Sequence, residues 1–257
     1  MPTVGYAPSS RGSIRTPVNC HDCAFKRFCL PAYLDEAETV RLEAIVKRNR
    51  PLHKGDHLFR AGDAMQQIYA LRSGALKTYL LNQDGAEQIT GFVLPGELIG
   101  LDAFGSSLFP SYAMALETSL VCSIALTELE ELADAIPHLR KQLFNTLSRE
   151  LHVEQEHLNH NRASAEQRLS MFLLNLSARY SRRGLSAVKF ILPMSRGEIA
   201  NYLGLTTETV SRLFTRFRLQ GLLEVQGREI QLTRPLFWVT TPHPVPAGAL
   251  PGAIIHA

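Results

Sequence analysis

The chain of 257 residues contains four cysteines, Cys20, Cys23, Cys29 and Cys122. The first three follow a Cys-x2-Cys-x5-Cys spacing, so a short loop can direct three thiolates at one metal centre. Cys122 lies in a distant apolar run and would supply the fourth thiolate. An iron-sulfur cluster and a zinc ion both accept four cysteines. A zinc site usually pairs two Cys-x2-Cys units, so the isolated fourth cysteine favours the cluster, although the spacing leaves zinc open.

The residues between these cysteines suit a metal site that is shielded from solvent. Phe25, Phe28 and Leu30 can cover a cluster, while Lys26 and Arg27 can offset its negative charge. Ordinary aromatic packing explains the same residues equally well, so both interpretations stay open.

A second group of residues, near the C-terminus, predicts a helix-turn-helix. Ser195 and Glu198 form a capping box that begins a helix. Gly204 allows a tight turn, and Thr206 or Thr207 can cap a second helix. The apolar positions that fit two helices packed on one core are Ile199, Leu203, Leu205, Val210, Leu213 and Phe217.

One face of the second helix can enter the major groove of DNA. Glu208, Ser211 and Arg212 lie at i, i+3 and i+4, hence on one face. Arg212 can bind a guanine, Glu208 can accept from a cytosine amino group, and Ser211 can bond a base or a phosphate. The candidates for contacts with the DNA backbone are Arg196, Thr206, Arg216 and Arg218. For the three arginines, a role as solvated surface residues is an equal alternative.

A long amphipathic helix is predicted before this region, from residue 137 to residue 161. It needs an apolar partner, and we expect a second copy of the chain, because a regulator that reads two half-sites needs a two-fold axis. Packing onto its own β-domain is the alternative. The expected seam consists of Arg140, Phe144, Leu147, Leu151, Glu154 and Leu158. Glu154 would face its own copy and weaken the dimer by charge repulsion.

The elements that position these residues follow from glycine punctuation and periodicity. Short β-like runs between residues 51 and 126 predict an antiparallel sandwich or roll, with a hairpin turn at Asn82–Gly85. Residues 34–48 and 163–180 predict further helices. The alternating segment around Gln226-Gly227 predicts a β-hairpin wing after the second helix.

Charge divides the chain into two regions. Residues 78–139 contain nine acids and no Lys or Arg, whereas residues 140–238 contain fifteen basic residues and eight acids. Phosphate would be repelled by the first region and attracted by the second, which is typical of a sensor joined to a nucleic-acid-binding domain. Two solvated surfaces of accidental sign are the plainer alternative.

These observations predict an α+β fold: an N-terminal antiparallel β-roll sensor, a long dimerisation helix and a C-terminal winged helix-turn-helix. The expected divisions are a flexible N-terminus (1–19), the cysteine loop and β-roll (20–136), the dimerisation helix (137–161), the DNA-binding domain (162–238) and a disordered tail (239–257). No segment reaches the roughly 18 apolar residues of a membrane span, which predicts a cytoplasmic protein.

From Cys20 to Leu236 the chain resembles the FNR branch of the CRP/FNR superfamily. The resemblance rests on the four cysteines, with Cys122 in LETSLVCSI, on LRSGALK and EQITGFVLPGELIGLDAF, and on GEIANYLGLTTETVSRL. It implies a β-roll like that of the cyclic-nucleotide-binding relatives. It also implies that the four cysteines hold an oxygen-labile [4Fe-4S] cluster, which stabilises a DNA-binding homodimer under anoxia and is lost on exposure to oxygen.

The resemblance further implies that Glu208, Ser211 and Arg212 read a palindrome like TTGAT-N4-ATCAA and regulate anaerobic genes, as activator or repressor. RNA polymerase would be a partner, with Asn82–Glu87 and Gly184–Ala187 as candidate contact segments.

Two other function classes find less support in the residues. A cyclic-nucleotide sensor would need a positive charge after the Gly96–Gly100 segment, but residues 101–117 contain no Lys or Arg, so we expect no cyclic nucleotide. No catalytic triad, phosphate-binding glycine loop or His-rich metal motif occurs, so we expect no enzyme.

Overall fold

The structure is a computed structural model that describes residues 19–160 and 163–233. The side chains of Val153, Glu154 and residues 156–160 also lie outside the described part. The expectations for a flexible N-terminus and a disordered tail concern almost only residues outside these ranges. Those for Glu154 and Leu158 in the seam concern undescribed side chains.

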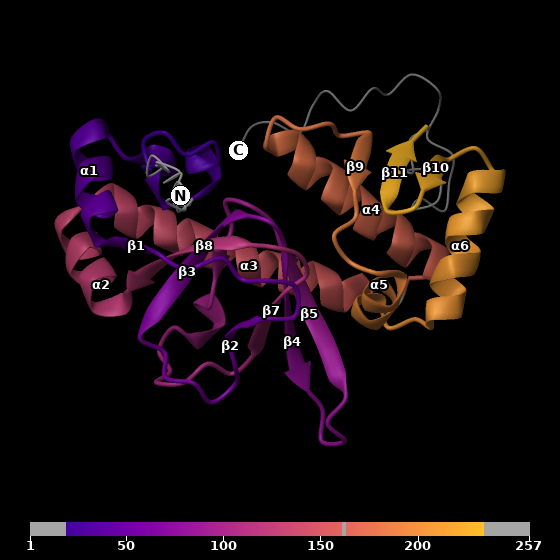
Figure 1. The fold of residues 1–257 in the computed structure, drawn as a ribbon, viewed down its shortest axis with the longest axis horizontal. Helices are drawn as coiled ribbons and strands as arrows, with labels where there is room; N and C mark the ends of the chain where they lie inside the picture. Colours follow the sequence, from indigo (N-terminus) through magenta and orange to yellow (C-terminus); the bar gives the residue numbers. More distant parts are fainter. Residues whose placement is uncertain (1–18, 161–162, 234–257) are drawn as a thin grey trace, which may run out of the picture.

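An antiparallel β-roll forms the first large unit (Figure 1). One four-stranded sheet has the order β1 (Val46–Arg48), β8 (Leu120–Ala125), β3 (Gln67–Ser73) and β6 (Leu98–Ile99). The other has the order β2 (His57–Phe59), β7 (Tyr112–Ala115), β4 (Leu76–Leu81) and β5 (Glu87–Val93). Apolar side chains from both sheets meet in one core, which includes Ile68, Leu71, Leu76 and Ile124. The predicted roll is confirmed.

The turn between β4 and β5 lies at the predicted hairpin. The amide of Asn82 donates to the carbonyl of Ala86 at 2.9 Å, and that of Gly85 donates to the carbonyl of Asn82 at 2.9 Å. Gly85 has a φ of 76°, a conformation that a residue without Cβ adopts at little cost. The glycine at this position therefore fixes where the strand pair reverses.

Several elements around the roll differ from the expectation or were not foreseen. The helix expected over residues 34–48 is shorter: α1 spans Glu36–Ile45, with Asp35 as its cap, and β1 follows at once. Pairing with β8 extends these last residues, because the strand satisfies their backbone groups. Strand β7 and helix α2 (Leu126–Ala135) were not predicted from the sequence.

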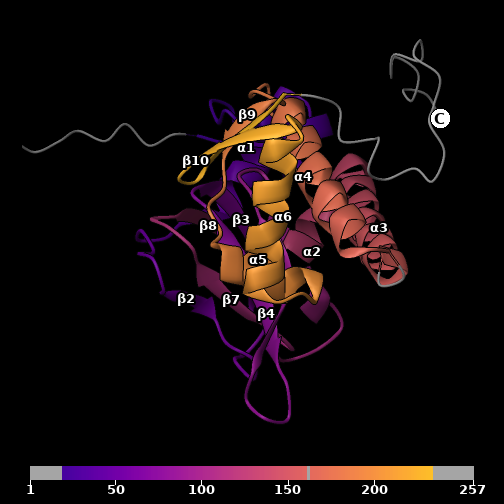
Figure 2. The same cartoon turned by 90° about the vertical axis from the view of Figure 1, so that its right-hand side faces the viewer.

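The long helix α3 (Pro137–His160) passes behind the roll and carries side chains of two kinds (Figures 1 and 2). Leu139 is buried, and Leu143 and Leu147 pack partly against the core of the roll. Phe144 and Leu151 are 65% exposed. One face of α3 therefore packs on the roll of its own chain, and another face is exposed in a single chain and available to a second copy. None of the helices in residues 19–160 and 163–233 is long and apolar enough to span a membrane.

The C-terminal unit is a winged helix-turn-helix, as predicted. It consists of α4 (Ala165–Arg182), β9 (Lys189–Ile191), α5 (Arg196–Leu203), α6 (Thr207–Leu219), β10 (Leu223–Gln226) and β11 (Glu229–Leu232). Strands pair in the order β10-β11-β9. Of the apolar positions predicted for the two-helix core, Leu205 is partly buried and the other five are buried.

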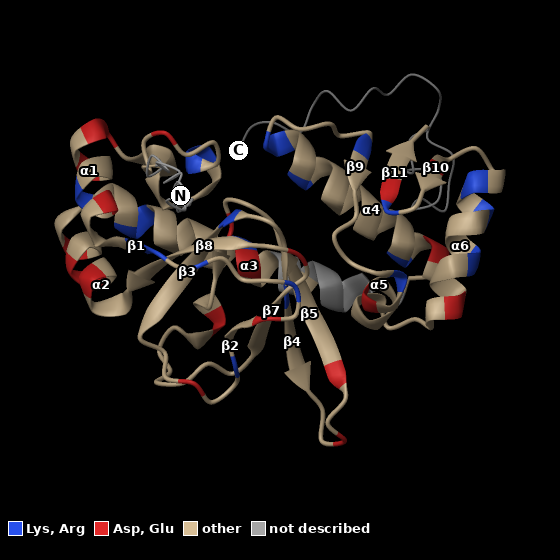
Figure 3. Cartoon of the chain, in the orientation of Figure 1, with Lys and Arg blue, Asp and Glu red and all other residues tan. Residues whose placement is uncertain are grey.

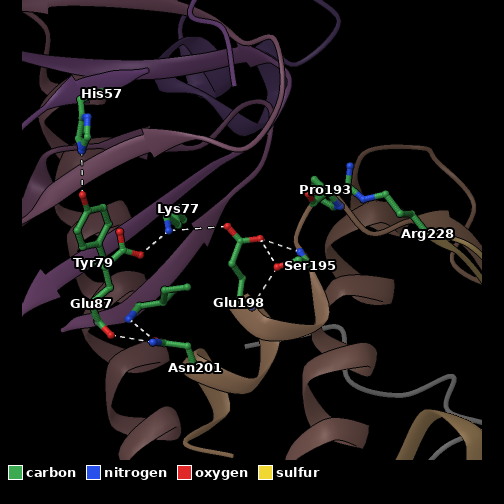
Figure 4. Close-up of polar contacts among 10 residues, drawn as sticks. His57, Lys77, Tyr79, Glu87, Pro193, Ser195, Glu198, Asn201 and Arg228 are labelled. Atoms are coloured by element: carbon green, nitrogen blue, oxygen red, sulfur yellow. Dashed lines mark hydrogen bonds and ion pairs between the residues drawn. The ribbon is translucent and has the colours of Figure 1, made fainter. Parts of the chain in front are cut away.

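Helix α5 packs directly against the roll through β5 (Figure 4). The side chain of Asn201 donates to the carbonyl of Glu87 at 2.7 Å and accepts from the amide of Ile89 at 2.7 Å. Lys77 on β4 lies 2.5 Å from the carboxylate of Glu87 and 3.8 Å from that of Glu198 on α5. Polar groups of both units are therefore satisfied across this contact.

Candidate functional site

The cysteine loop is built from successive tight turns. The amide of Cys23 donates to the carbonyl of Cys20 at 3.4 Å, that of Lys26 to Cys23 at 3.1 Å, and that of Cys29 to Lys26 at 3.4 Å. These i to i+3 bonds let a ten-residue segment carry three thiols within a small volume. Cys122 comes from β8, where it stands opposite Arg48 of β1 and Ala70 of β3.

The pKa shifts of three of the thiols include contributions from the other cysteines. Burial and the neighbouring Cys122, Glu43 and Cys23 raise the pKa of Cys20 to about 12. Burial also raises the pKa of Cys29 to about 12, against a hydrogen bond from the Leu30 amide, and the other three cysteines add to the rise. Burial and Cys23 raise the pKa of Cys122. Every pair among the four cysteines thus interacts, although Cys122 is remote in sequence.

The four thiols are the candidate metal ligands of the chain. All four cysteines are free thiols. Within the described residues, no three side chains of His, Cys, Asp or Glu come close enough together to hold one metal ion. A zinc ion draws its sulfur ligands to about 2.3 Å from one centre. Four cysteine thiols are a donor set that an iron-sulfur cluster accepts, and zinc accepts the same set.

The surroundings of the thiols partly follow the expectation. Leu30 is buried, and Phe25 and Phe28 are partly buried. The positive charges that act most on the thiols are those of Arg48 and Arg72, which lower the pKa values that burial raises. Arg48 and Arg72 approach through strand pairing that the sequence does not display, and the expectation that Lys26 and Arg27 offset the charge of a cluster stays a prediction.

The face of α6 that carries Glu208, Ser211 and Arg212 is exposed to solvent, and Figure 2 shows this helix at the surface of the C-terminal unit. Glu208 and Arg212 are 71% and 78% exposed, and their carboxylate and guanidinium groups are 2.6 Å apart. The hydroxyl of Ser211 donates to the carbonyl of Thr207 at 2.8 Å. The structure places the three residues together, as predicted, and pairs two of them with each other.

The four candidates for contacts with the DNA backbone have different environments. Thr206 caps α6 by accepting from the amide of Thr209 at 3.1 Å. The guanidinium of Arg196 lies over the ring of Phe214 at 3.2 Å, and burial lowers its pKa to about 10. Arg216 pairs with Glu166 of α4, and Arg218 lines an open hollow beside the wing.

The distribution of charge supports the division that the sequence predicted. Lys and Arg side chains are spread over α4, β9 and α6, whereas the tip of the roll and helices α1 and α2 carry many acids (Figure 3). Arg140 at the start of α3 is exposed and lies 3.9 Å from Asp134. The basic surface and the exposed face of α6 therefore belong to the same unit.

The two units match described families. Residues 49–135 match the cyclic nucleotide-binding domain, and residues 167–235 match the Crp-like helix-turn-helix domain. The transcriptional activator protein FnrA of Stutzerimonas stutzeri is 49% identical over 215 residues, which cover 83% of this chain and 88% of FnrA. The fumarate and nitrate reduction regulatory protein of Escherichia coli K12 is 45% identical over 216 residues, covering 84% and 86% of the two chains. This chain belongs to the FNR type of the CRP/FNR family.

Solved structures agree with this membership of the FNR type. FixK2 of Bradyrhizobium japonicum superposes with a TM-score of 0.71 at 28% identity, over 78% of this chain and all of FixK2. The c-di-GMP-responsive regulator CLP of Xanthomonas campestris has a TM-score of 0.62 at 22% identity and shares the fold. As a CRP/FNR protein, the chain is a DNA-binding transcription regulator and not an enzyme, as predicted.

Sequence reasoning missed the residues that join the two units of this FNR-type chain. Asn201 lies inside the predicted helix-turn-helix, and Glu97 lies in the Gly-Glu-Leu-Ile-Gly segment, but neither was assigned a role. A polar side chain on the core side of a short helix, such as Asn201, is the signal that could have found one of them. Nothing in the sequence pairs Glu97 with α4.

Proposed function

We propose that this FNR-type chain is an oxygen-sensing regulator of anaerobic gene expression whose Cys20, Cys23, Cys29 and Cys122 hold a [4Fe-4S] cluster. The observation that carries the proposal is the interaction of every pair among these four thiols across the loop and β8. Such a cluster supplies an oxygen-labile redox centre whose loss frees its four thiolate ligands.

The same chain would act on DNA as a homodimer. Phe144 and Leu151 offer an exposed apolar surface on α3, and α6 offers Glu208, Ser211 and Arg212 on an open face. A two-fold arrangement of two such helices suits a palindrome like TTGAT-N4-ATCAA. Arg196, Thr206, Arg216 and Arg218 would contact the DNA backbone.

Other partners follow from the same family membership. We propose RNA polymerase as a partner, a cytoplasmic location and no cyclic nucleotide ligand. The last point is supported by the absence of Lys and Arg from residues 101–117. A buried cyclic phosphate there would lack a counter-charge.

The test is anaerobic purification followed by exposure to air. Iron and sulfide analysis should give about four of each per chain, with visible absorption that bleaches in air as the protein loses its dimer and its affinity for the palindrome. Cys122→Ser serves as the matched variant and should lack the absorption while keeping the fold. A colourless protein with one zinc per chain, or one that binds the palindrome equally in air, would contradict the proposal.

A further inference from the structure

The turn between β5 and β6 packs against the cysteine loop. The amide of Leu94 donates to the Glu97 carboxylate at 2.9 Å, and that of Gly96 donates to the carbonyl of Leu71 at 2.7 Å. A Cβ on Gly96 would lie 2.9 Å from the Cβ of Phe28 and 3.2 Å from that of Phe25. The backbone of the turn therefore touches two residues that lie between Cys23 and Cys29.

The other side of the same turn binds the DNA-binding unit. Arg179 and Arg183 lie in α4 and just after it, and each places guanidinium nitrogens 2.5 Å from the carboxylate of Glu97. Arg179 also donates to the carbonyl of Phe92 at 2.6 Å, and Arg183 to that of Pro95 at 2.7 Å. Two arginines thus clamp both the side chain and the backbone of the turn.

A third contact joins the DNA-binding unit directly to the cysteine loop. The guanidinium carbon of Arg183 lies 5.7 Å from the centre of the Phe28 ring, within the range of a cation–π contact. The side chain of Arg183 is only 4% exposed, so this ring lies in a desolvated place. One residue of the DNA-binding unit therefore contacts both the turn and the cysteine loop.

This set contains one carboxylate and two guanidinium groups. Burial would raise the pKa of Glu97, but the charges and hydrogen bonds of Arg179 and Arg183, with the Leu94 amide, hold it below its ordinary value. The carboxylate is therefore ionised at neutral pH. Removing Glu97 would leave two largely buried guanidinium groups without their counter-charge, which is costly.

We propose that Phe28, Gly96, Glu97, Arg179 and Arg183 form a junction that couples the order of the cysteine loop to the docking of the DNA-binding unit within one protomer. The loop's part as a sensor rests on the proposed function, but the coupling itself does not need a cluster. The junction acts beside the α3 seam, since none of its residues lies on α3. Because coupling is reciprocal, a change on either side must be felt on the other.

The experiment is hydrogen–deuterium exchange of the full chain, without and with its cluster, in oxygen-free buffer. Phe28→Leu changes only the loop, and its readout is exchange in β5, where the Ile89 amide is bonded to Asn201. Arg183→Gln changes only the DNA-binding unit, and its readout is exchange over residues 20–30. Tyr33→Leu and Ser181→Ala are the controls, because Tyr33 is a 71% exposed aromatic residue just after the loop and Ser181 is an exposed residue of α4 near Arg183.

The junction predicts that each variant speeds exchange several-fold on the opposite side, with or without cluster, while both controls behave as wild type. An effect confined to the side that carries the substitution would overturn the proposal. So would an equal rise throughout β3 and β8, since that result would mean general loosening of the fold. A protein that lacks iron but still shows the cross-effect would refute the cluster and retain the junction.

Discussion

Replacement of Phe144 by alanine tests whether the open face of α3 is a dimer seam. Burial of a whole phenylalanine side chain contributes about 1.5–3 kcal/mol. Because 65% of Phe144 is exposed in one chain, about 1–2 kcal/mol of that remains for association. Two copies meet in a dimer, so the change should weaken it by about 2–4 kcal/mol, or roughly 30- to 700-fold in the dissociation constant.

Sedimentation equilibrium of the cluster-loaded protein measures this constant, and circular dichroism checks the fold of the monomer. Asn145→Ala is the matched control, because Asn145 is the exposed neighbour of Phe144 on the same helix. Leu147→Ala should behave differently and lower the monomer's stability, since Leu147 packs against its own roll. A dimer constant that is the same in Phe144→Ala and wild type would refute the assignment of this face.

Three further predictions concern the DNA-binding unit and its docking. Asn201→Ala removes two hydrogen bonds to β5 and should lower the free energy of unfolding by about 2 kcal/mol. Calorimetry should then show a melting temperature about 4–8 °C lower. An unchanged melting temperature would contradict the docking contact. The folded pKa of Glu97 lies below its ordinary value of 4.5, so the ionised carboxylate stabilises the fold above that pH and this stabilisation is lost as the pH falls through the folded pKa. Glu97→Gln should therefore weaken the dependence of the unfolding free energy on pH in the acid range. An unchanged pH dependence would count against the ion pairs. Arg212→Ala should cost about 1–3 kcal/mol of discrimination at one base pair of each half-site, measured by competition binding. Arg216→Ala should mainly reduce, by about one, the slope of log DNA affinity against log salt concentration. Equal behaviour of the two variants would contradict their separate roles.

The helix-turn-helix could be predicted because its signals are local. Ser195 and Glu198 cap α5 as the capping box requires, with the Glu198 amide 3.2 Å from the Ser195 hydroxyl. Gly204 adopts a φ of 63°, where a side chain would be strained. Each of these choices is made within a few residues, so the sequence alone displays it.

The surroundings of the thiols could be predicted only in part. The loop spacing of Cys20, Cys23 and Cys29 is local, and Cys122 is conspicuous because it is the only other cysteine. Arg48 and Arg72 reach the site through the pairing of β1 and β3 with β8, which depends on the register of strands far apart in sequence. Long-range register leaves no signature in either strand alone, so these residues could not be foreseen.

The docking of the two units could not be predicted from the sequence either, because it also depends on contacts between segments that are far apart in the chain. Arg179 and Arg183 read as ordinary basic residues near the end of a helix, where they favour the helix dipole. Their pairing with Glu97 depends on how α4 lies against the roll, which no periodicity encodes. The acidic and basic halves of the chain therefore predict two separate units while concealing the charges that hold them together.

The ion pair between Glu208 and Arg212 bears on how the regulator searches a genome. While the pair is closed, the tip of α6 is nearly neutral and offers little to the phosphates of unrelated DNA, so the protein can slide there on its other arginines. If Glu208 and Arg212 read bases as proposed, the pair has to open where a guanine and a cytosine amino group replace the bonds that each partner gives up. On this proposal the ion pair is an internal competitor for chance sites, carried on the same helix that would contact the bases.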